Sequence, residues 1–323
     1  MIRRLALIAA LLLAAPAHAA PMPAAEQAAV IETAAALIET RYVDPQAGRA
    51  IARALRRERS LAAPAEPQAL AERLTAFLRD RAADGHFQVS WSGKPLSAAA
   101  FSEAMTAGDI DRYYGPKLNY GVARVEQLDG NVMLLDLRVF PPADTAGDVI
   151  AAAMTLVAQG DALIIDLRRN GGGMDTVVMV AGYLLPPNTQ LSGAYDRPSG
   201  KLTPQTTAIW QPGRRFGPDK PVYILTGKRT FSAAEALAYD LQSLKRAIVV
   251  GEVSGGGANP FEYRRLTDHF ALSLPEKRSV SPVTGTNWQG VGVKPDVPAP
   301  ADRALEVALD LARAELKRRA AAS

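Results

Sequence analysis

The stretch that decides the fold reads Pro221-Val222-Tyr223-Ile224-Leu225-Thr226-Gly227-Lys228-Arg229-Thr230-Phe231-Ser232-Ala233-Ala234-Glu235. Its first part is short, rich in β-branched and aromatic residues, and bounded by proline and glycine, which is typical of a buried strand. The alanine-rich sequence after Ser232 favours a helix. Ser232 is therefore predicted to lie at the turn between a strand and a helix.

Ser232 has two possible roles at such a turn. Backbone N–H groups at the start of a helix are unpaired and point outward, so they can stabilise a negative charge that develops beside a nucleophilic serine. Alternatively, Ser232 caps the helix, and Glu235, three residues later, completes a capping box. This stretch alone leaves both interpretations open.

The sequence around this stretch alternates between strands and helices. Strands are predicted at 120–125, 131–137, 162–167, 222–226 and 247–250, and helices at 145–159, 174–185 and 233–244. This order implies right-handed crossovers and an α/β fold with a mostly parallel sheet and helices on its faces. Functional groups are expected at the carboxyl ends of the strands, where both Gly171-Gly172-Gly173 and Ser232 fall.

Glycine-rich runs at 171–173 and 255–257 raise the question of phosphate binding. Three glycines before a helix can form an anion-binding nest, because glycine accepts positive φ freely. Neither run carries the Lys-Ser/Thr of a P-loop, and no GxGxxG frame is present. We therefore expect no nucleotide and no other cofactor.

The chain before residue 83 has a different character. Residues 1–20 combine Arg3 and Arg4, a short apolar run and Ala17-His18-Ala19, which is typical of a secretory signal peptide. Apolar residues at three- and four-residue spacing then predict about three helices within 21–82, which we interpret as a small helical domain. Residues 83–323 are interpreted as the α/β core.

Composition excludes several functions. The chain has no cysteine, so no thiol nucleophile or thiolate metal site is possible. Removal of the signal lowers the formal charge from +4 to +2, without the basic stripe that nucleic-acid binding needs. Only His86 and His269 then remain for histidine chemistry. Asp268-His269 lacks further ligands at metal-binding spacing, so no metal site is expected.

Three later regions complete the prediction. Residues 186–221 are rich in proline and glycine and are predicted to be an irregular excursion, able to shape or cover a groove. Strands are predicted within 262–274 and a final helix at 301–318. His86, after the turn Asp84-Gly85, is predicted at the first residue of a strand.

Four motifs together resemble the S41 peptidases, which include the carboxy-terminal processing (tail-specific) proteases, tricorn core proteases and interphotoreceptor retinoid-binding protein repeats. They are 164–173 (Ile-Ile-Asp-Leu-Arg-Arg-Asn-Gly-Gly-Gly), 230–235 (Thr-Phe-Ser-Ala-Ala-Glu), 249–252 (Val-Val-Gly-Glu) and 290–296 (Gly-Val-Gly-Val-Lys-Pro-Asp). The resemblance implies a ClpP/crotonase-like protease core with Ser232 as nucleophile. It also implies an oxyanion hole formed by the N–H groups of Ala233 and Gly172, or of a neighbour such as Gly171.

The resemblance also bears on the catalytic base. Carboxy-terminal processing enzymes use a lysine in a Gly-Lys-Gly element, where this chain has Gly256-Gly257-Ala258. The tricorn-like and retinoid-protein-like branch takes a histidine from an Asp-Gly-His element after a helical domain, which Asp84-Gly85-His86 matches. This makes His86 the expected base. The interval between Trp91 and Tyr120 is too short for a PDZ domain.

One departure concerns the acid of the expected site. Relatives usually carry a glutamate at the position of Gln289, where a carboxylate would orient the histidine and stabilise its protonated form. Either Ser232, His86 and Gln289 form a site of reduced activity, or another carboxylate such as Glu235 or Glu252 serves.

Two functions follow from the resemblance. The first is an exported serine endopeptidase, periplasmic or secreted and without a stable membrane anchor, that hydrolyses peptides or unfolded proteins. The alternative is a catalytically weak or inactive protein that binds a hydrophobic ligand or peptide in the same cleft. Gln289 favours the alternative, whereas Ser232, His86 and the glycine loop favour the enzyme.

Overall fold

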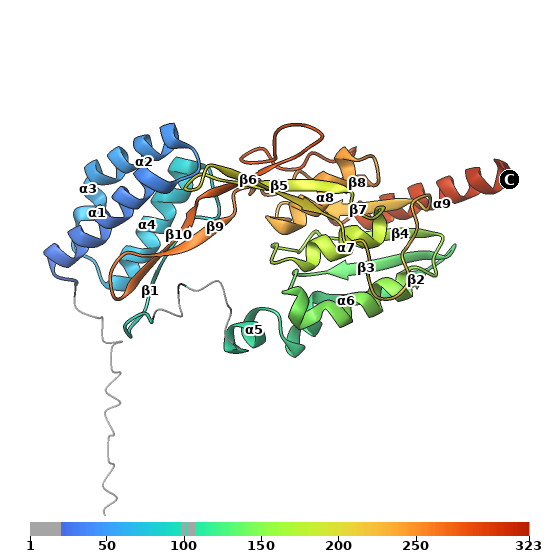
Figure 1. The fold of residues 1–323 in the computed structure, drawn as a ribbon, viewed down its shortest axis with the longest axis horizontal. Helices are drawn as coiled ribbons and strands as arrows, with labels where there is room; N and C mark the ends of the chain where they lie inside the picture. The colour runs from blue at the N-terminus through green and yellow to red at the C-terminus, as the bar shows by residue number, and fades with distance from the viewer. Residues whose placement is uncertain (1–20, 98–100, 102–106, 323) are drawn as a thin grey trace, which may run out of the picture.

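The computed structural model describes residues 21–97, 101 and 107–322, so the expected signal peptide at 1–20 lies outside the described residues. Figure 1 shows two parts side by side, with the N-terminal helices at the left and an α/β part at the right. Within the described residues, no helix is both long enough and apolar enough to cross a membrane.

Four helices form most of the left-hand part: α1 (Ala24–Arg41), α2 (Pro45–Arg57), α3 (Arg59–Ala62) and α4 (Pro67–Ala82). The single turn α3 adds to the three that we expected. Proline at the first position of α2 and α4 suits a helix start, because its missing N–H has no intrahelical partner there. The Asp44 carboxylate also caps α2 by accepting the backbone N–H groups of Gln46 and Ala47.

A small antiparallel sheet completes the core of this helical part. It contains β1 (Gln88–Trp91), β10 (Phe270–Pro275) and β9 (Phe261–Arg265), in the order β1-β10-β9. Alternate residues of β10, among them Leu272 and Leu274, are buried in one cluster with the helices. The N-terminal helices therefore share their core with strands from late in the chain. Helices α5 (Ala107–Tyr113) and η2 (Pro116–Gly121) lead from this sheet to the α/β part.

The right-hand part is built on a six-stranded sheet of order β12-β8-β7-β4-β3-β2. All neighbouring strands are parallel except β2 and β3, which form a hairpin. The bounds are β2 (Val122–Leu128), β3 (Val132–Leu137), β4 (Ala162–Asp166), β7 (Val222–Thr226), β8 (Ile248–Gly251) and β12 (Val297–Pro298). The predicted α/β class with a mostly parallel sheet is confirmed.

Helices cover both faces of this sheet. One face packs against α6 (Ala143–Val157), α7 (Thr176–Leu184) and α8 (Ala233–Ser243). The other face packs against α9 (Ala304–Ala322), which presents Ala304, Ala308 and Ala312. Small residues at this spacing lie on one side of a helix and allow close approach to the strands.

The prediction that residues 186–221 are irregular was wrong for its first half. Strands β5 (Gln190–Asp196) and β6 (Lys201–Thr206) form a hairpin, and β5 also pairs with β11 (Lys277–Val280). Proline is tolerated at Pro204 because β6 is an edge strand. Gly193 is needed at an irregularity of the ladder, since a Cβ there would lie 2.7 Å from the Thr203 carbonyl oxygen.

Candidate active site

Ser232 lies at the turn between β7 and α8, as the sequence predicted. Its φ of 55° and ψ of −119° are rarely adopted by residues other than glycine, so neighbouring groups must hold the turn. The Phe231 N–H donates to the Asn170 carbonyl oxygen at 3.0 Å, and the Ser232 N–H donates to the Glu235 carboxylate at 2.8 Å. The capping box expected from the sequence is therefore present at the start of α8, with Glu235 as its third residue.

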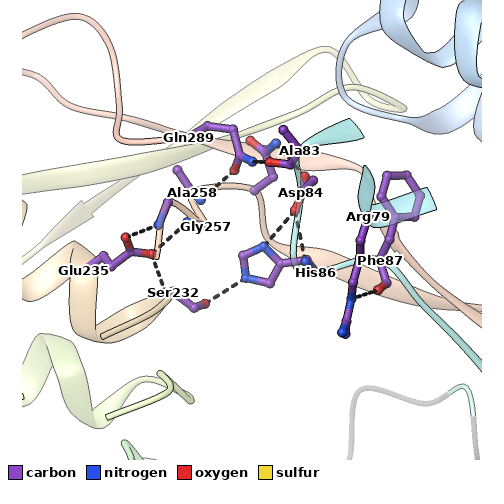
Figure 2. Close-up of polar contacts among 12 residues, drawn as sticks. Arg79, Ala83, Asp84, His86, Phe87, Ser232, Glu235, Gly257, Ala258 and Gln289 are labelled. Carbon is purple, nitrogen blue, oxygen red and sulfur yellow. Dashed lines mark hydrogen bonds and ion pairs between the residues drawn. The ribbon is translucent and has the colours of Figure 1, made fainter. Parts of the chain in front are cut away.

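The hydroxyl of Ser232 meets the imidazole ring of His86. Ser232 Oγ lies 3.1 Å from His86 Nε2, although the two residues are 146 positions apart in the sequence. On the other side of the ring, Nδ1 lies 3.2 Å from Asp84 Oδ1, and Figure 2 shows the ring between Ser232 and Asp84. A carboxylate only accepts hydrogen bonds, so this contact favours a proton on Nδ1 and leaves Nε2 as the acceptor for the serine proton.

Asp84 is the residue that sequence reasoning missed. Its side chain is fully buried, and its Oδ1 also accepts the backbone N–H of His86 at 3.0 Å. Its Oδ2 accepts the side-chain Nδ2–H of Asn259 at 2.9 Å. Aspartate often bonds the backbone two residues ahead, so the Asp84-Gly85-His86 sequence itself carried the signal.

Several contacts fix the position of His86, which precedes β1 by two residues and is not the first residue of the strand as predicted. Arg79 of α4 donates from Nε to the carbonyl oxygen of Phe87 at 2.7 Å. The His86 ring lies 4.7 Å from the Phe231 ring and 5.8 Å from the Phe261 ring, centroid to centroid. Glycine is required at Gly85, because a Cβ there would approach the Phe231 ring to 2.9 Å.

The expectation that Gln289 takes the place of the acid is corrected. Its Oε1 accepts the Ala258 N–H at 2.8 Å and its Nε2 donates to the Ala83 carbonyl oxygen at 3.0 Å, as Figure 2 shows. Gln289 thus ties the glycine-rich segment to the residue before Asp84. An amide suits this position because it must both donate and accept, which a carboxylate cannot do.

Of the other two carboxylates considered, Glu235 has different partners, and no hydrogen bond joins the Glu252 carboxylate to His86 within the described residues. Glu235 is fully buried and accepts the N–H groups of Ser232, Gly256 and Gly257 and the hydroxyl of Ser254. Burial raises the pKa of Glu235, and these hydrogen bonds oppose that rise. Glu235 therefore holds the backbone behind Ser232. The backbone carbonyl of Glu252 accepts the Thr226 hydroxyl.

The glycine loop lies against Ser232, but the N–H of Gly172 is occupied. It donates to Asn170 Oδ1 at 2.8 Å, so the expectation that Gly172 supplies an oxyanion donor is corrected. Gly172 has a φ of 104°, and a Cβ there would lie 2.8 Å from Ser232 Cβ and 3.0 Å from the Ala233 nitrogen. Gly172 therefore permits close approach. Within the described chain, no hydrogen bond is found for the N–H groups of Gly171 and Ala233.

His269 lies away from Ser232, at a turn of the small antiparallel sheet. His269 Nδ1 lies 2.8 Å from the Ser92 carbonyl oxygen, which places His269 at the turn between β9 and β10. Among the residues that the structure describes, no group of three or more His, Cys, Asp or Glu side chains could hold a metal ion.

Comparison with known proteins gives a match to a family and matches to curated relatives. The sequence matches the model of peptidase family S41 over residues 121–299. A carboxy-terminal-processing protease from Bartonella bacilliformis is 28% identical over 144 residues, which make up 42% of this chain and 30% of that protein. The chain therefore matches less than a third of that relative's length.

Solved structures with low sequence identity share the fold. A lipoprotein from Streptococcus agalactiae superposes with a TM-score of 0.59 and 17% identity, over 93% of this chain and 99% of that one. The tricorn protease gives a TM-score of 0.60 and 14% identity, over 91% of this chain and 37% of that one.

A serine, a histidine and a carboxylate in hydrogen-bonded series at the end of a parallel strand is an arrangement typical of serine hydrolases. The family match covers more than half of the chain. The chain belongs to peptidase family S41.

Proposed function

We propose that this protein is an exported serine endopeptidase that hydrolyses peptide bonds in peptides or unfolded proteins. The observation that carries the proposal is the series Ser232 Oγ, His86 Nε2 and Nδ1, and Asp84 Oδ1, with separations of 3.1 and 3.2 Å. These separations are within hydrogen-bond reach of a nucleophile, its base and the group that orients the base.

In the proposed reaction, His86 Nε2 takes the proton of Ser232 as Oγ forms a bond to the peptide carbonyl carbon. The N–H of Ala233 and an N–H of the glycine loop, with Gly171 as a candidate, stabilise the oxyanion. The C–N bond then breaks and His86 gives the proton to the leaving amine. Water, deprotonated by His86, hydrolyses the acyl-enzyme to a carboxylic acid and restores the Ser232 hydroxyl.

Asp84 supports this function over the ligand-binding alternative. That alternative rested on the missing carboxylate at Gln289. Asp84 offers a carboxylate on the side of His86 away from Ser232, where it can orient the ring and stabilise its protonated form. The acid of the proposed triad is therefore Asp84.

The branch and the compartment are also proposed. The Asp84-Gly85-His86 element after the N-terminal helices supports a place in the tricorn-like and retinoid-protein-like branch of the family. The signal-like sequence at 1–20 supports a periplasmic or secreted location.

The test is hydrolysis of unfolded casein by the purified protein without residues 1–20. Ser232→Ala and His86→Ala should each lower the rate by at least about 10⁴-fold, as removal of a nucleophile or base does in other serine triads. A fluorophosphonate probe should label the wild type and not Ser232→Ala, which assigns the nucleophile independently of substrate choice. Cleavage that persists in Ser232→Ala would overturn the proposal.

A further inference from the structure

Strand β9 reverses the usual alternation of a surface strand. Two of its three charged residues, Glu262 and Arg264, are half-buried, whereas Arg265 at the end of the strand is exposed. The Arg264 guanidinium pairs with the buried carboxylate of Glu276 at 2.7 Å. Its aromatic residues Phe261 and Tyr263 point to the other face, where they are 36% and 51% exposed. A strand that only stabilises the fold would place its aromatic side chains in the core and its charges outside.

The two exposed rings are held against each other and lie beside the candidate active site. The Phe261 and Tyr263 rings meet edge to face at a centroid separation of 5.3 Å, a favourable geometry for aromatic pairs. The Phe261 ring also lies 5.8 Å from the His86 ring. Together Phe261 and Tyr263 form what we call the β9 aromatic pair.

Helix α5 and the residue after it bring further aromatic side chains to the same place. Burial raises the pKa of Tyr114, and the neighbouring phenols of Tyr263 and Tyr113 raise it further. Burial likewise raises the pKa of Tyr263, with Tyr113 as the next cause. Tyr113 is 50% exposed. Tyr113 and Tyr114 therefore lie near Tyr263, with Tyr113 exposed and Tyr114 half-buried.

The chemistry of the proposed peptidase indicates which part of a substrate would reach the β9 aromatic pair. The leaving amine must approach His86 Nε2 to receive its proton, whereas the oxyanion must lie near Ala233 and the glycine loop. The leaving portion of the peptide therefore extends from Ser232 toward the side of His86, where Phe261 begins the β9 aromatic pair.

We propose that Phe261 and Tyr263 bind a large apolar or aromatic side chain on the leaving-group side of the scissile bond and thereby set cleavage preference. This inference rests on the proposed peptidase function. Burial of such a side chain against the pair would favour it over glycine or serine by about ten- to hundredfold in kcat/KM.

The experiment maps cleavage sites in a synthetic peptide library by mass spectrometry. The wild type should cleave before large apolar or aromatic residues, and Tyr263→Ala should lose this preference while it still cleaves bonds followed by glycine or serine. Tyr263→Phe, which keeps the ring, should retain the preference. Trp210→Ala removes a ring that is 76% exposed on the segment after β6, and should leave the preference unchanged.

The outcomes separate this inference from the proposed function. Cleavage with the same preference in wild type and Tyr263→Ala would overturn the inference and leave the peptidase intact. If the wild type cleaves nothing, the peptidase proposal fails. The affinity of the protein for model peptides then tests whether Phe261 and Tyr263 bind an aromatic side chain. Fluorescein-labelled glycine-serine decapeptides with a central Phe or Ser would then be titrated into Ser232→Ala protein. The Phe peptide should bind at least about tenfold tighter than the Ser peptide, and this difference should disappear when Tyr263 is also replaced by alanine. Equal affinity for the two peptides would overturn the inference.

Discussion

Replacement of Asp84 by asparagine tests the acid of the proposed triad most directly. Asp84 Oδ1 accepts two hydrogens of His86 and Oδ2 accepts one from Asn259. An asparagine has a single oxygen, and that oxygen should stay on His86, because the opposite orientation would set its NH₂ against the backbone N–H of His86. Asn259 must then rotate its amide to present its oxygen to the new NH₂ group.

The size of the effect follows from this geometry. If the asparagine oxygen stays on His86, the tautomer is kept and only the charge is lost. Loss of a charge-assisted hydrogen bond costs about 1.5–3 kcal/mol, which lowers kcat by about ten- to hundredfold. If the amide turns the other way, the wrong tautomer forms and the loss approaches about 10⁴-fold.

A charge swap sharpens the test. In the double variant Asp84→Asn with Asn259→Asp, the new carboxylate accepts the NH₂ of the asparagine and returns a negative charge to the series. The double variant should therefore be faster than Asp84→Asn alone in kcat on casein or on a quenched fluorescent peptide, with thermal unfolding as the control for folding. Wild-type activity in Asp84→Asn would refute the assignment of Asp84 as the acid.

Three further predictions concern other contacts of the site and of α8. Gln289→Glu should be slower than the wild type and less stable by about 0.5–1.5 kcal/mol, since it loses the solvent-exposed bond to the Ala83 carbonyl oxygen and sets an oxygen against it. A faster enzyme would contradict this contact. Gly172→Ala should abolish activity and lower the unfolding free energy by about 1–3 kcal/mol, because its methyl group would meet Ser232 and Gly172 has a positive φ. Gly171→Ala is the control, since its methyl group meets no atom within 4 Å. It should preserve stability in the same denaturation assay. Burial raises the pKa of Asp240 from 3.8 to about 6 despite hydrogen bonds from Ser192, so the folded state keeps a proton that the unfolded chain releases. The unfolding free energy of the wild type should therefore fall by up to about 3 kcal/mol as the pH rises from about 4 to about 6. In urea unfolding, Asp240→Asn should become more stable relative to the wild type over the same pH range. A stability difference that does not change with pH would refute the raised pKa of Asp240.

Local pattern was enough to predict the elements that carry the site. The apolar run at 222–226 corresponds to β7 residue for residue, and Ser232 begins the helix that follows. The pairing of Ser232 with His86 came from the resemblance to a family, because no spacing rule relates residues 146 positions apart. Local pattern failed at 190–206, where proline and glycine masked a hairpin whose edge strand tolerates them.

The acid of the site could not be assigned from motif position. Family pattern pointed to Gln289, yet its amide bonds to Ala258 and Ala83, while Asp84 lies against His86. Asp84 lies only two residues before His86, and its second carboxylate oxygen accepts a hydrogen bond from Asn259, 175 positions further along the chain. The packing of the folded chain also leaves Phe261 exposed beside His86.

The sequence by itself determined the α/β class and the strand-to-helix turn at Ser232, because these depend on periodicity and turn chemistry. The preference for His86 over a lysine as the proposed base came from the resemblance to a family. Only the tertiary structure decided that Asp84 contacts His86, that the Gly172 N–H is bound to Asn170, and that strands from 261–275 complete the core of the N-terminal helices. The first two contacts are local, between residues two positions apart, but the side-chain orientations that make them depend on burial in the folded chain. The third joins segments far apart in the sequence, which no local preference can predict.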